Sequence, residues 1–344
     1  RYLTTGAKFA LAAALKAVKG SGLDKKRISS AGIIAGVGPN MDIGSVVKEI
    51  SEGIIDEKNL RALWLLEFLP NSVTAAISFL TGIHGENITI NSACATSLQA
   101  VGEGFRKIKD RYLDIVLAGG GDSRISQGGI LAYKKAYALY KGDKKPEKAV
   151  MPFDKSRGGF VMGEGSGCFI LEELDHALER GANILAEVIG YGVSLDGGQI
   201  TAPDSEGIWA EKAVNSALKE ACVEPDEIDV ISAHGTGTLL NDSMETRLIN
   251  RVFSKSNPLV IALKSWVGHL STACGAAELS ICLGLLENNF VPKIRNLESP
   301  CDENIKFVRE NMEISFDKIL LQNFGFGGQN AALVVKKWNH TKEI

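Results

Sequence analysis

Short apolar runs rich in β-branched residues alternate along the chain with longer segments whose apolar residues recur every three or four positions. Short continuous runs are typical of buried strands, whereas the longer spacing is typical of amphipathic helices. The short runs lie at residues 31–35, 88–91, 114–118, 168–172, 184–191, 228–233, 259–264 and 331–335. Strands separated by helices in this way predict an α/β protein with largely buried sheets.

Three helical segments stand out. Residues 1–19 place apolar side chains at helical spacing, and lysines interrupt a stretch that would otherwise resemble a signal peptide. Residues 97–108 carry little charge in their early turns, and residues 272–286 carry Glu278 as their only charge. Helices without a polar face are buried, and we expect these two to lie between sheet layers.

The order of these elements occurs twice. In the first half, two short runs precede a helix, and the glycine turn at 163–165 leads into a further run. In the second half, two runs precede the small-residue helix, and the glycine turn at 325–328 leads into the last run. The offset of roughly 165 to 200 residues is too irregular for a solenoid. The sequence therefore predicts two copies of one α/β unit, residues 1–175 and 176–344.

Composition and charge exclude several classes of protein. Apolar residues make up 45% of the 344 residues and the net charge is −3, which argues against a disordered chain or a general nucleic-acid binder. The longest later apolar run, residues 279–286, is far shorter than the roughly 20 residues of a membrane span. The six cysteines form no C-x-x-C pair and predict reduced thiols. We therefore expect a cytoplasmic protein that binds neither nucleic acid nor a membrane.

Cys94 lies where a predicted strand passes into a helix, within Asn91-Ser92-Ala93-Cys94-Ala95-Thr96-Ser97. Unpaired N–H groups and the positive end of the helix would lower the pKa of a thiol there and favour the nucleophilic thiolate. The segment alone is equally compatible with a small buried core cysteine. Cys274 sits in a similar Ala-Cys-Gly context in the second copy, but inside the predicted helix, and we assign it to packing.

Two histidines lie in glycine-flanked turns just beyond predicted strands. His234 opens His234-Gly235-Thr236-Gly237-Thr238, and His269 follows Gly268. Such turns are where α/β folds place ligands, although each histidine alone is more often structural. The histidines lack the paired spacing of a metal site, and no glycine cluster has the Walker or dinucleotide-binding pattern.

Taken together, these motifs resemble the β-ketoacyl-[acyl-carrier-protein] synthases, the condensing enzymes of fatty-acid and polyketide synthesis. The resemblance implies a thiolase-like fold, in which two duplicated α/β halves form a layered α-β-α-β-α sandwich. It runs from the first helix to the last strand and rests on motifs in family order: Ala93–Ser97, Pro152–Arg157, Gly163–Gly165, Ala233–Thr238, Lys264–Ser265 with Gly268–His269, and Asn323–Gly328.

The resemblance implies the chemistry of a 3-oxoacyl synthase. Cys94 would take an acyl group from an acyl carrier protein, and a malonyl carrier would then lose CO₂ to give the attacking carbanion. His234 and His269 would stabilise the enolate electrostatically rather than relay protons. The backbone N–H groups of Cys94 and Phe326 would form the oxyanion hole, with Phe326 also gating the acyl pocket. No cofactor is implied beyond the phosphopantetheine arm of the carrier.

Further residues match supporting positions of the family. Lys264 resembles the active-site lysine, and Glu278 resembles its acidic partner. The pairing is physically reasonable, because a lone carboxylate in an apolar helix must find a cation or lose its charge. Three threonines match positions that bind the phosphopantetheine arm: Thr201, Thr236 and Thr238.

The chain departs from the family pattern in two places. The family opens with a strand that would precede residue 1, so the first copy is incomplete as given. Bacterial elongation synthases place basic residues before the segment that corresponds to Leu69-Pro70-Asn71, where this chain has Leu63-Trp64-Leu65-Leu66-Glu67-Phe68, and Met151 replaces an arginine. An acidic carrier would meet less positive charge there, which favours a specialised polyketide or polyene pathway.

Two other functions are compatible with the fold. A chain-length-factor-like subunit would be non-catalytic and would pair with a ketosynthase, but the intact Cys94 argues against it. A thiolase would transfer acyl groups to coenzyme A, but its second catalytic cysteine is absent. We expect either a homodimer or a heterodimer with a chain-length factor. Acyl chain length depends on the subunit interface and on the loop near Val37 to Met41.

Overall fold

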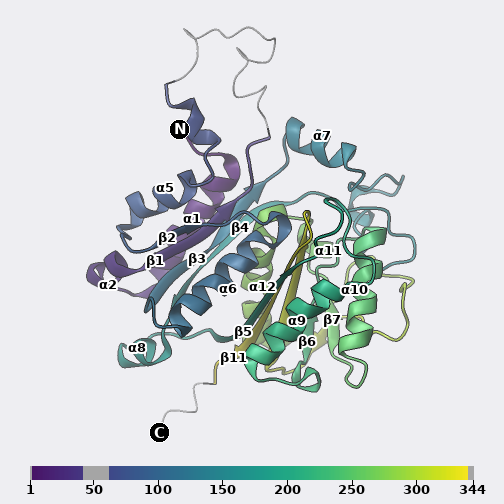
Figure 1. Ribbon diagram of the computed structural model, residues 1–344. Coiled ribbons are helices and arrows are strands. Elements are labelled where there is room, and N and C mark those ends of the chain that lie inside the picture. Colours follow the sequence, from purple (N-terminus) through teal and green to yellow (C-terminus); the bar gives the residue numbers. More distant parts are fainter. Residues whose placement is uncertain (1, 42–61, 340–344) are drawn as a thin grey trace.

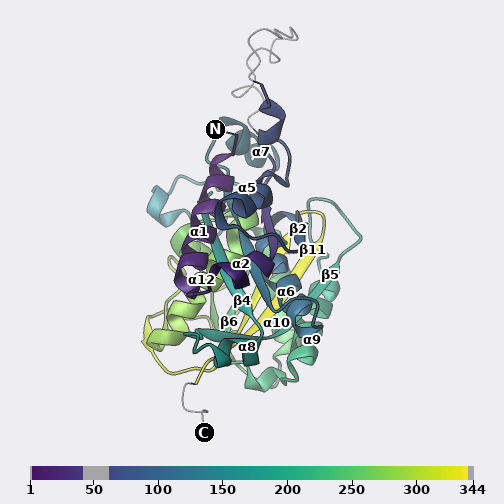
Figure 2. The ribbon, with the colours of Figure 1, turned by 90° about the vertical axis from the view of Figure 1, so that its left-hand side faces the viewer.

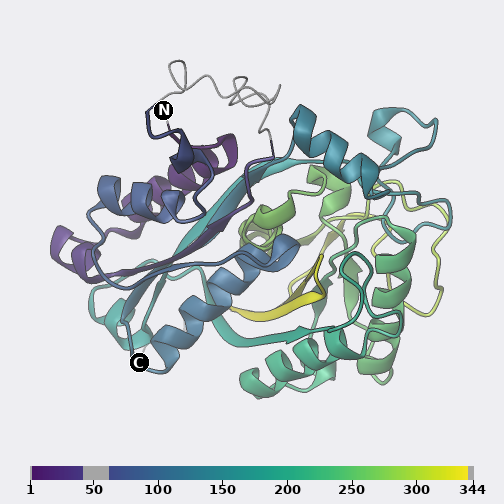
Figure 3. The same ribbon diagram turned by 45° about the horizontal axis from the view of Figure 1, so that its top comes forward.

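The computed structural model describes residues 2–41 and 62–339 and arranges them in five layers (Figures 1 and 3). Helices α1 (Thr5–Ser21) and α5 (Ser72–Thr81) cover the outer face of the first sheet. Helices α6 (Thr96–Lys109) and α12 (Cys274–Asn288) lie between the two sheets, and α9 (Ile208–Ala221) and α10 (Leu239–Val252) cover the second sheet. The predicted α-β-α-β-α sandwich with a thiolase-like fold is confirmed.

The two sheets share one arrangement of strands. In the first, the order is β2 (Asn87–Thr89), β1 (Gly32–Val37), β3 (Ile115–Ser123) and β4 (Glu164–Glu172), with only β4 antiparallel to its neighbour. The second has the order β5, β11, β10, β6 and β7. Its members are β5 (Ala186–Leu195), β11 (Gln329–Lys337), β10 (Lys318–Gly325), β6 (Val230–Ser232) and β7 (Leu259–Ile261).

The duplication can be followed strand by strand. Strands β6, β7 and β10 are mutually parallel in the order of β1, β2 and β3, and β11 runs antiparallel to β10 as β4 does to β3. In the second sheet, β5 pairs with the outer edge of β11. Among the described residues the first sheet has no counterpart of β5, so the additional family strand stays a prediction.

Shorter elements complete the described chain. They are α2 (Lys25–Ser30), α7 (Gln127–Lys135), α8 (Leu174–Glu179), α11 (Lys264–Val267), a small sheet of β8 (Phe290–Val291) with β9 (Met312–Glu313), and the 3₁₀ turns η1 (Trp64–Glu67), η2 (Ala93–Ala95), η3 (Pro146–Lys148), η4 (Pro225–Glu227) and η5 (Ser271–Ala273). Figure 2 shows α7 at one end of the molecule, away from α8 and α9. None of the helices in the described ranges is both long and apolar enough to cross a membrane.

The central helices α6 and α12 pack closely because small residues face each other. A Cβ on Gly275 would lie 2.4 Å from the Cβ of Leu98 and 2.6 Å from the side-chain oxygen of Asn323. Real Cβ atoms do not approach other atoms that closely, so only glycine fits where the two helices and β10 meet. This contact brings the N-termini of both helices to the same region between the sheets.

One predicted element was wrong, and one strand was missed. The run 259–264 was expected to be one strand, but β7 ends at Ile261 and Lys264 begins α11. Strand β10 was not predicted, because the glycines of 325–328 dominate the local pattern and obscure the apolar run that precedes them. Both errors concern the second sheet close to the site.

Cys274 belongs to helix α12, as predicted, and is the first residue of that helix. Its φ and ψ of −49° and −58° match the −48° and −56° of Thr96, which begins α6. The residues at the start of the preceding turns, Ala93 and Ser271, both have a positive φ, 49° and 53°. Counting from these residues, the structural counterpart of Cys94 is Thr272, and Cys274 corresponds to Thr96.

Candidate active site

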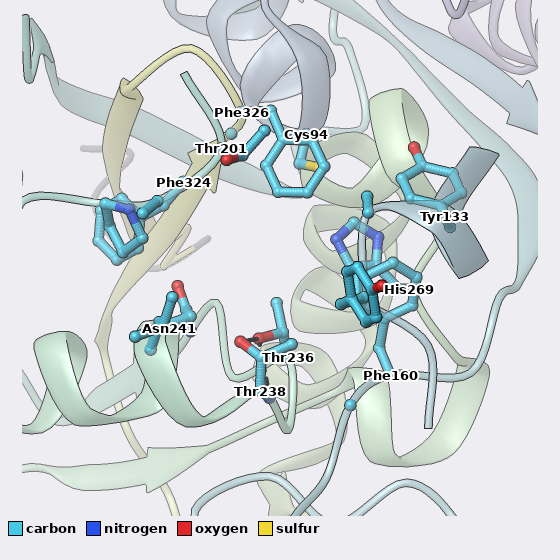
Figure 4. A pocket seen from close by; sticks show the side chains of 18 of the residues that line it. Cys94, Tyr133, Phe160, Thr201, Thr236, Thr238, Asn241, His269, Phe324 and Phe326 are labelled. Carbon is cyan, nitrogen blue, oxygen red and sulfur yellow. Dashed lines mark hydrogen bonds between the residues drawn. The ribbon is translucent and has the colours of Figure 1, made fainter. Parts of the chain in front are cut away.

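A cavity of about 320 Å³ opens between the two halves. Seven of the nine predicted site residues line it: Cys94, Thr201, His234, Thr236, Thr238, His269 and Phe326. Figure 4 shows Cys94 and Phe326 on one side of this cavity, with His269 and Thr236 across from them. The other two predicted residues, Lys264 and Glu278, are fully buried behind His234. The structure therefore brings all nine predicted residues to one region.

The turn that holds Cys94 is fixed by its neighbours. Thr96 accepts a hydrogen bond from the Ser92 N–H at 2.8 Å and donates one to the Ala93 carbonyl at 2.7 Å, which stabilises the positive φ of Ala93. The end of β10 lies against this turn at Gly325, whose added Cβ would be only 2.9 Å from the Cys94 nitrogen. The close approach places the Phe326 N–H within hydrogen-bonding reach of the Cys94 sulphur.

The prediction of a lowered thiol pKa at Cys94 was wrong. Cys94 is only 7% exposed, and burial raises the pKa of its thiol to about 12. The positive charge of Lys264 and the Phe326 N–H act in the opposite direction but do not outweigh the loss of solvation. The resting Cys94 side chain is therefore a thiol rather than a thiolate.

His234 is a neutral imidazole with a defined tautomer. Burial, and then the nearby charge of Lys264, hold its pKa well below the usual value. The Lys264 ammonium group can only donate hydrogen bonds, and its Nζ lies 3.1 Å from Nδ1 of His234. Since Nδ1 accepts this bond, the ring proton is on Nε2.

The loop that carries His234 is held by a buried carboxylate. Glu245 on α10 accepts hydrogen bonds from the backbone N–H groups of His234 and Gly235, at 2.6 and 2.8 Å. Burial raises the pKa of Glu245 to about 7, although these bonds oppose the shift. Sequence reasoning missed Glu245. A charged residue on the buried face of an otherwise ordinary helix was the available signal.

His269 has the same tautomer for a different reason. The backbone N–H of Ser271 donates to Nδ1 of His269 at 2.9 Å, which leaves the proton on Nε2. Burial, aided by the charge of Lys264, lowers the pKa of His269 to about 3. The two imidazoles lie 5.6 Å apart between centroids and are nearly perpendicular. Both are neutral, so each offers an N–H donor without adding a positive charge.

Lys264 and Glu278 form a buried ion pair. The Lys264 Nζ lies 2.6 Å from Glu278 Oε1, and the Asn323 amide donates to the other carboxylate oxygen at 2.8 Å. Burial alone would lower the pKa of Lys264, but the attraction of Glu278 raises it, so the lysine stays charged. The predicted pairing is correct in geometry. The contribution of Asn323 was missed because glycines dominate the motif in which it lies.

Aromatic side chains that were not predicted complete the cavity wall. The Phe160 ring lies 4.5 Å from the His269 ring between centroids, and Tyr133 packs edge-on against Phe160. The Tyr133 hydroxyl is hydrogen-bonded to the Ser271 hydroxyl at 2.9 Å. Figure 4 shows Tyr133 and Phe160 on the two sides of His269. No motif marks these residues, because their elements meet only in the folded chain.

The predicted phosphopantetheine residues surround the outer part of the cavity. The hydroxyls of Thr236 and Thr238 lie 2.9 Å apart, and Thr201 faces them from the other wall. The loop of Phe326 is anchored where the Gly327 N–H donates to the Ile200 carbonyl at 2.7 Å. Phe326 itself is 39% exposed, so its ring lies at the boundary between the cavity and solvent.

The duplicated five-layer fold and this arrangement of one cysteine with two neutral histidines define a thiolase-like condensing enzyme. The N-terminal domain model of the beta-ketoacyl synthases matches residues 3–177, and the C-terminal domain model matches residues 185–298. The chain therefore belongs to the β-ketoacyl synthase family, and it is an acyltransferase of the class that forms carbon–carbon bonds.

Individual relatives agree with this assignment. The chain is 31% identical to 3-oxoacyl-[acyl-carrier-protein] synthase 2 of Vibrio cholerae serotype O1, over 96% of this chain and 82% of the relative. It is 36% identical to the synthase 2 of Rhizobium meliloti, over 96% and 80%. Among solved structures, the ishigamide ketosynthase/chain length factor superposes with a TM-score of 0.89 at 31% identity, over 98% of this chain and 83% of that one. A type II polyketide ketosynthase, solved in complex with its acyl-carrier protein and bound to the hexaketide, has a TM-score of 0.88 at 26% identity, over 98% and 86%.

Proposed function

We propose that this chain is a 3-oxoacyl-[acyl-carrier-protein] synthase that condenses a Cys94-bound acyl group with a malonyl carrier. The observation that carries the proposal is the meeting of Cys94 with two Nε2–H donors, from His234 and His269, in one cavity. The names of the relatives at 31% and 36% identity support the same substrates.

The first step is acyl transfer. The Cys94 sulphur bonds to the thioester carbonyl carbon, the bond from that carbon to the carrier sulphur breaks, and the Cys94 proton ends on the departing carrier thiol. Neither imidazole has a free acceptor nitrogen, since Nδ1 of each already accepts a hydrogen bond. The histidines therefore act as donors, in keeping with the electrostatic role expected from the sequence. The N–H groups of Cys94 and Phe326 are positioned to bind the oxyanion.

The second step is decarboxylative condensation. Loss of CO₂ leaves an electron pair on the malonyl α-carbon, and the negative charge that develops on the thioester oxygen accepts hydrogen bonds from the two Nε2–H groups. The carbanion attacks the acyl carbonyl on Cys94. Collapse of the intermediate breaks the carbon–sulphur bond and releases the 3-oxoacyl carrier, and the thiolate takes up a proton. Burial disfavours a free thiolate at Cys94. The buried pocket therefore favours the neutral acylated form of Cys94 over the free thiolate.

The remaining residues support these steps. Lys264, with Glu278 as its counter-ion, fixes the tautomer of His234. Thr201, Thr236 and Thr238 would bind the phosphopantetheine arm, and Phe326 would gate the acyl pocket. The reaction needs no cofactor or metal beyond that arm.

The partners and setting follow from the same proposal. We propose an acyl carrier protein as the substrate carrier and a second ketosynthase-like chain as the subunit partner. Structures with a carrier and with a chain length factor, both described above, support these two classes. We retain residues 1–175 and 176–344 as the two halves, and a cytoplasmic location as a prediction.

The test uses the intact chain with an acyl-loaded carrier and a malonyl-loaded carrier. We expect mass spectrometry to find the acyl group on Cys94 and a 3-oxoacyl product, and we expect Cys94→Ala to lose both. Cys222→Ala is the matched control, because Cys222 is the exposed cysteine and would be the first to react in a non-enzymatic transfer. Acylation of Cys222 instead of Cys94, or no product with both carriers, would reject the proposal. Either outcome would favour the alternative of a non-catalytic, chain-length-factor-like subunit.

A further inference from the structure

A contact between two hydroxyl groups connects a surface helix to the turn beside His269. Helix α7 lies at one end of the molecule (Figure 2), and Gly129 is the only one of its nine residues that is fully buried. Tyr133 is the residue of α7 that lines the cavity, and its hydroxyl lies 2.9 Å from the hydroxyl of Ser271. Ser271 is buried and begins the turn η5. The contact therefore joins a helix on the surface of the first half to a buried turn of the second.

The backbone of Ser271 has a conformation that needs support. Its φ of 53° lies in the left-handed region, which residues other than glycine rarely adopt. The equivalent residue of the first copy, Ala93, has a φ of 49° and is held by the two hydroxyl bonds of Thr96. The second copy has Cys274 at the position of Thr96, and a thiol is a weak donor and acceptor. The hydroxyl of Tyr133 supplies the second turn with a stronger hydrogen bond.

The conformation of Ser271 determines how the imidazole of His269 is held. The Ser271 N–H donates to Nδ1 of His269 at 2.9 Å, which leaves the ring proton on Nε2. A change in the φ of Ser271 would turn this N–H away from Nδ1. The hydroxyl bond from α7 therefore stabilises the turn that fixes the tautomer and the orientation of the ring.

The ring and the hydroxyl of Tyr133 make separate contacts. The ring packs edge-on against Phe160, with 5.4 Å between centroids, and Phe160 in turn lies 4.5 Å from the ring of His269. Figure 4 shows the Tyr133 ring on the cavity side of these contacts, next to His269. Only the hydroxyl contacts Ser271. The substitution Tyr133→Phe therefore removes the link to the turn and keeps the aromatic packing.

We infer that Tyr133 is a positioning residue for His269 and acts through the hydroxyl of Ser271 and the backbone of η5. This inference rests on the proposed function, in which the Nε2–H of His269 stabilises the enolate that decarboxylation produces. Acylation of Cys94 uses instead the N–H groups of Cys94 and Phe326. These lie on segments held by contacts other than the Tyr133 hydroxyl, so the effect should be confined to decarboxylation.

The experiment compares three variants with one control. The variants are Tyr133→Phe, Ser271→Ala and the double substitution. Alanine is compatible with the left-handed backbone at position 271, because Ala93 adopts nearly the same φ in the first copy. The control is Tyr140→Phe, which removes a hydroxyl from a half-buried tyrosine of the same segment. The Tyr140 hydroxyl accepts only a long bond of 3.4 Å from the Lys144 N–H, and Tyr140 does not line the cavity.

Two half-reactions are measured separately. One is the release of CO₂ from a malonyl-loaded bacterial acyl carrier protein, and the other is acylation of Cys94 by the octanoyl thioester of N-acetylcysteamine. We expect each single variant to lower kcat for CO₂ release about 5- to 10-fold, the effect of losing one hydrogen bond between neutral groups. We expect KM for the malonyl carrier and the acylation rate to stay unchanged. The double variant should lose no more than either single variant, because all three lack the same bond.

The control variant should behave as the unmodified chain does. A loss in Tyr133→Phe that Ser271→Ala does not reproduce would show that the Tyr133 hydroxyl acts on the substrate directly and would overturn the inference. Additive losses in the double variant, an equal slowing of acylation, or a loss of the same size in Tyr140→Phe would overturn it as well.

A spectroscopic measurement tests the inference without any substrate. In the ¹⁵N-histidine-labelled chain, NMR shows which ring nitrogen carries the proton, and the signals of His269 are those lost in His269→Gln. We expect Tyr133→Phe to place part of the His269 proton on Nδ1, whereas His234 keeps its Nε2–H because Lys264 still donates to its Nδ1. Unchanged His269 signals would overturn the inference. Failure of the unmodified chain to release CO₂ from the malonyl carrier would instead reject the proposed function.

Discussion

The buried pair of Lys264 and Glu278 allows stability and catalysis to be separated by mutation. Both side chains are almost completely inaccessible to solvent, and the charged atoms lie 2.6 Å apart. Removing one partner leaves the other charge buried without compensation. We therefore consider three variants: Lys264→Met, Glu278→Gln and the double substitution. In the double variant neither charge remains, and the glutamine introduced at position 278 can still accept the hydrogen bond from Asn323.

The expected magnitudes follow from the burial. Each single substitution should lower the free energy of unfolding by about 3–5 kcal/mol, the usual cost of breaking a buried ion pair. That is a large part of the total of about 5–15 kcal/mol for a folded domain. The double variant should be near the stability of the unmodified chain, since neutral side chains of similar volume replace the pair. The coupling energy between the two sites should then be at least about 3 kcal/mol.

Catalysis should not recover with stability. A methionine at position 264 cannot donate to Nδ1 of His234, so the Nε2–H tautomer is no longer enforced. Loss of one preorganised donor to a developing oxyanion costs about 10²–10³ in rate. The measurements are urea unfolding for stability and malonyl-carrier decarboxylation for activity. A double variant that is both stable and active would refute the tautomer argument, and additive losses of stability would refute the pairing itself.

Three further predictions concern the same site. Alkylation of Cys94 by iodoacetamide, measured in the Cys222→Ala background, should keep accelerating from about pH 6 to about pH 9, because the pKa of the Cys94 thiol is near 12. A plateau in the alkylation rate near neutral pH would contradict this. His269 has a pKa of about 3 in the folded protein, below its unfolded value, so its contribution to stability is complete above about pH 6.5 and is lost as the pH falls. Urea unfolding at several pH values should therefore show a flatter dependence of the free energy of unfolding on pH for His269→Gln. An unchanged pH dependence would count against the burial of His269 as a neutral ring. Gly325→Ala would place a Cβ 2.8 Å from the Ser92 carbonyl oxygen. It should lower the free energy of unfolding in urea by about 1–3 kcal/mol and slow the acylation of Cys94. An unaltered urea midpoint and an unaltered acylation rate would show that the loop of Gly325 and the turn of Cys94 can separate freely.

The residues proposed to touch substrate could be predicted because each lies in a local motif. Cys94, His234 and His269 occupy turns next to glycines or small residues, and their order along the chain carries the resemblance to the family. The duplication could be predicted as well, since the buried strands and the two apolar helices repeat in order, whereas the five-layer sandwich was implied by the resemblance to the family. These features depend on neighbours in sequence.

The missed features depend on contacts between distant segments. The raised pKa of the Cys94 thiol results from burial by chain far from residue 94, which outweighs the helix end that the local sequence shows. Glu245 acts on His234 from the next helix, and Asn323 reaches Glu278 across the interface of β10 with α12. Tyr133 meets Ser271 across 138 residues of sequence. A single sequence contains the partners but not their pairing.

The two copies of the helix-initiating turn show why Cys274 is not the structural counterpart of Cys94. At the equivalent position, Thr272 donates its hydroxyl to Asp122 of β3 at 2.9 Å, and its backbone N–H donates to the same oxygen at 3.1 Å. The second turn therefore joins the two halves and, through the Ser271 N–H, orients His269. The first turn leaves the corresponding side chain, Cys94, facing the cavity. One backbone geometry thus presents the proposed nucleophile in one copy and holds His269, the proposed catalytic histidine, in the other. A cysteine placed at position 272 would therefore lie against the Asp122 carboxylate rather than create a second acylation site.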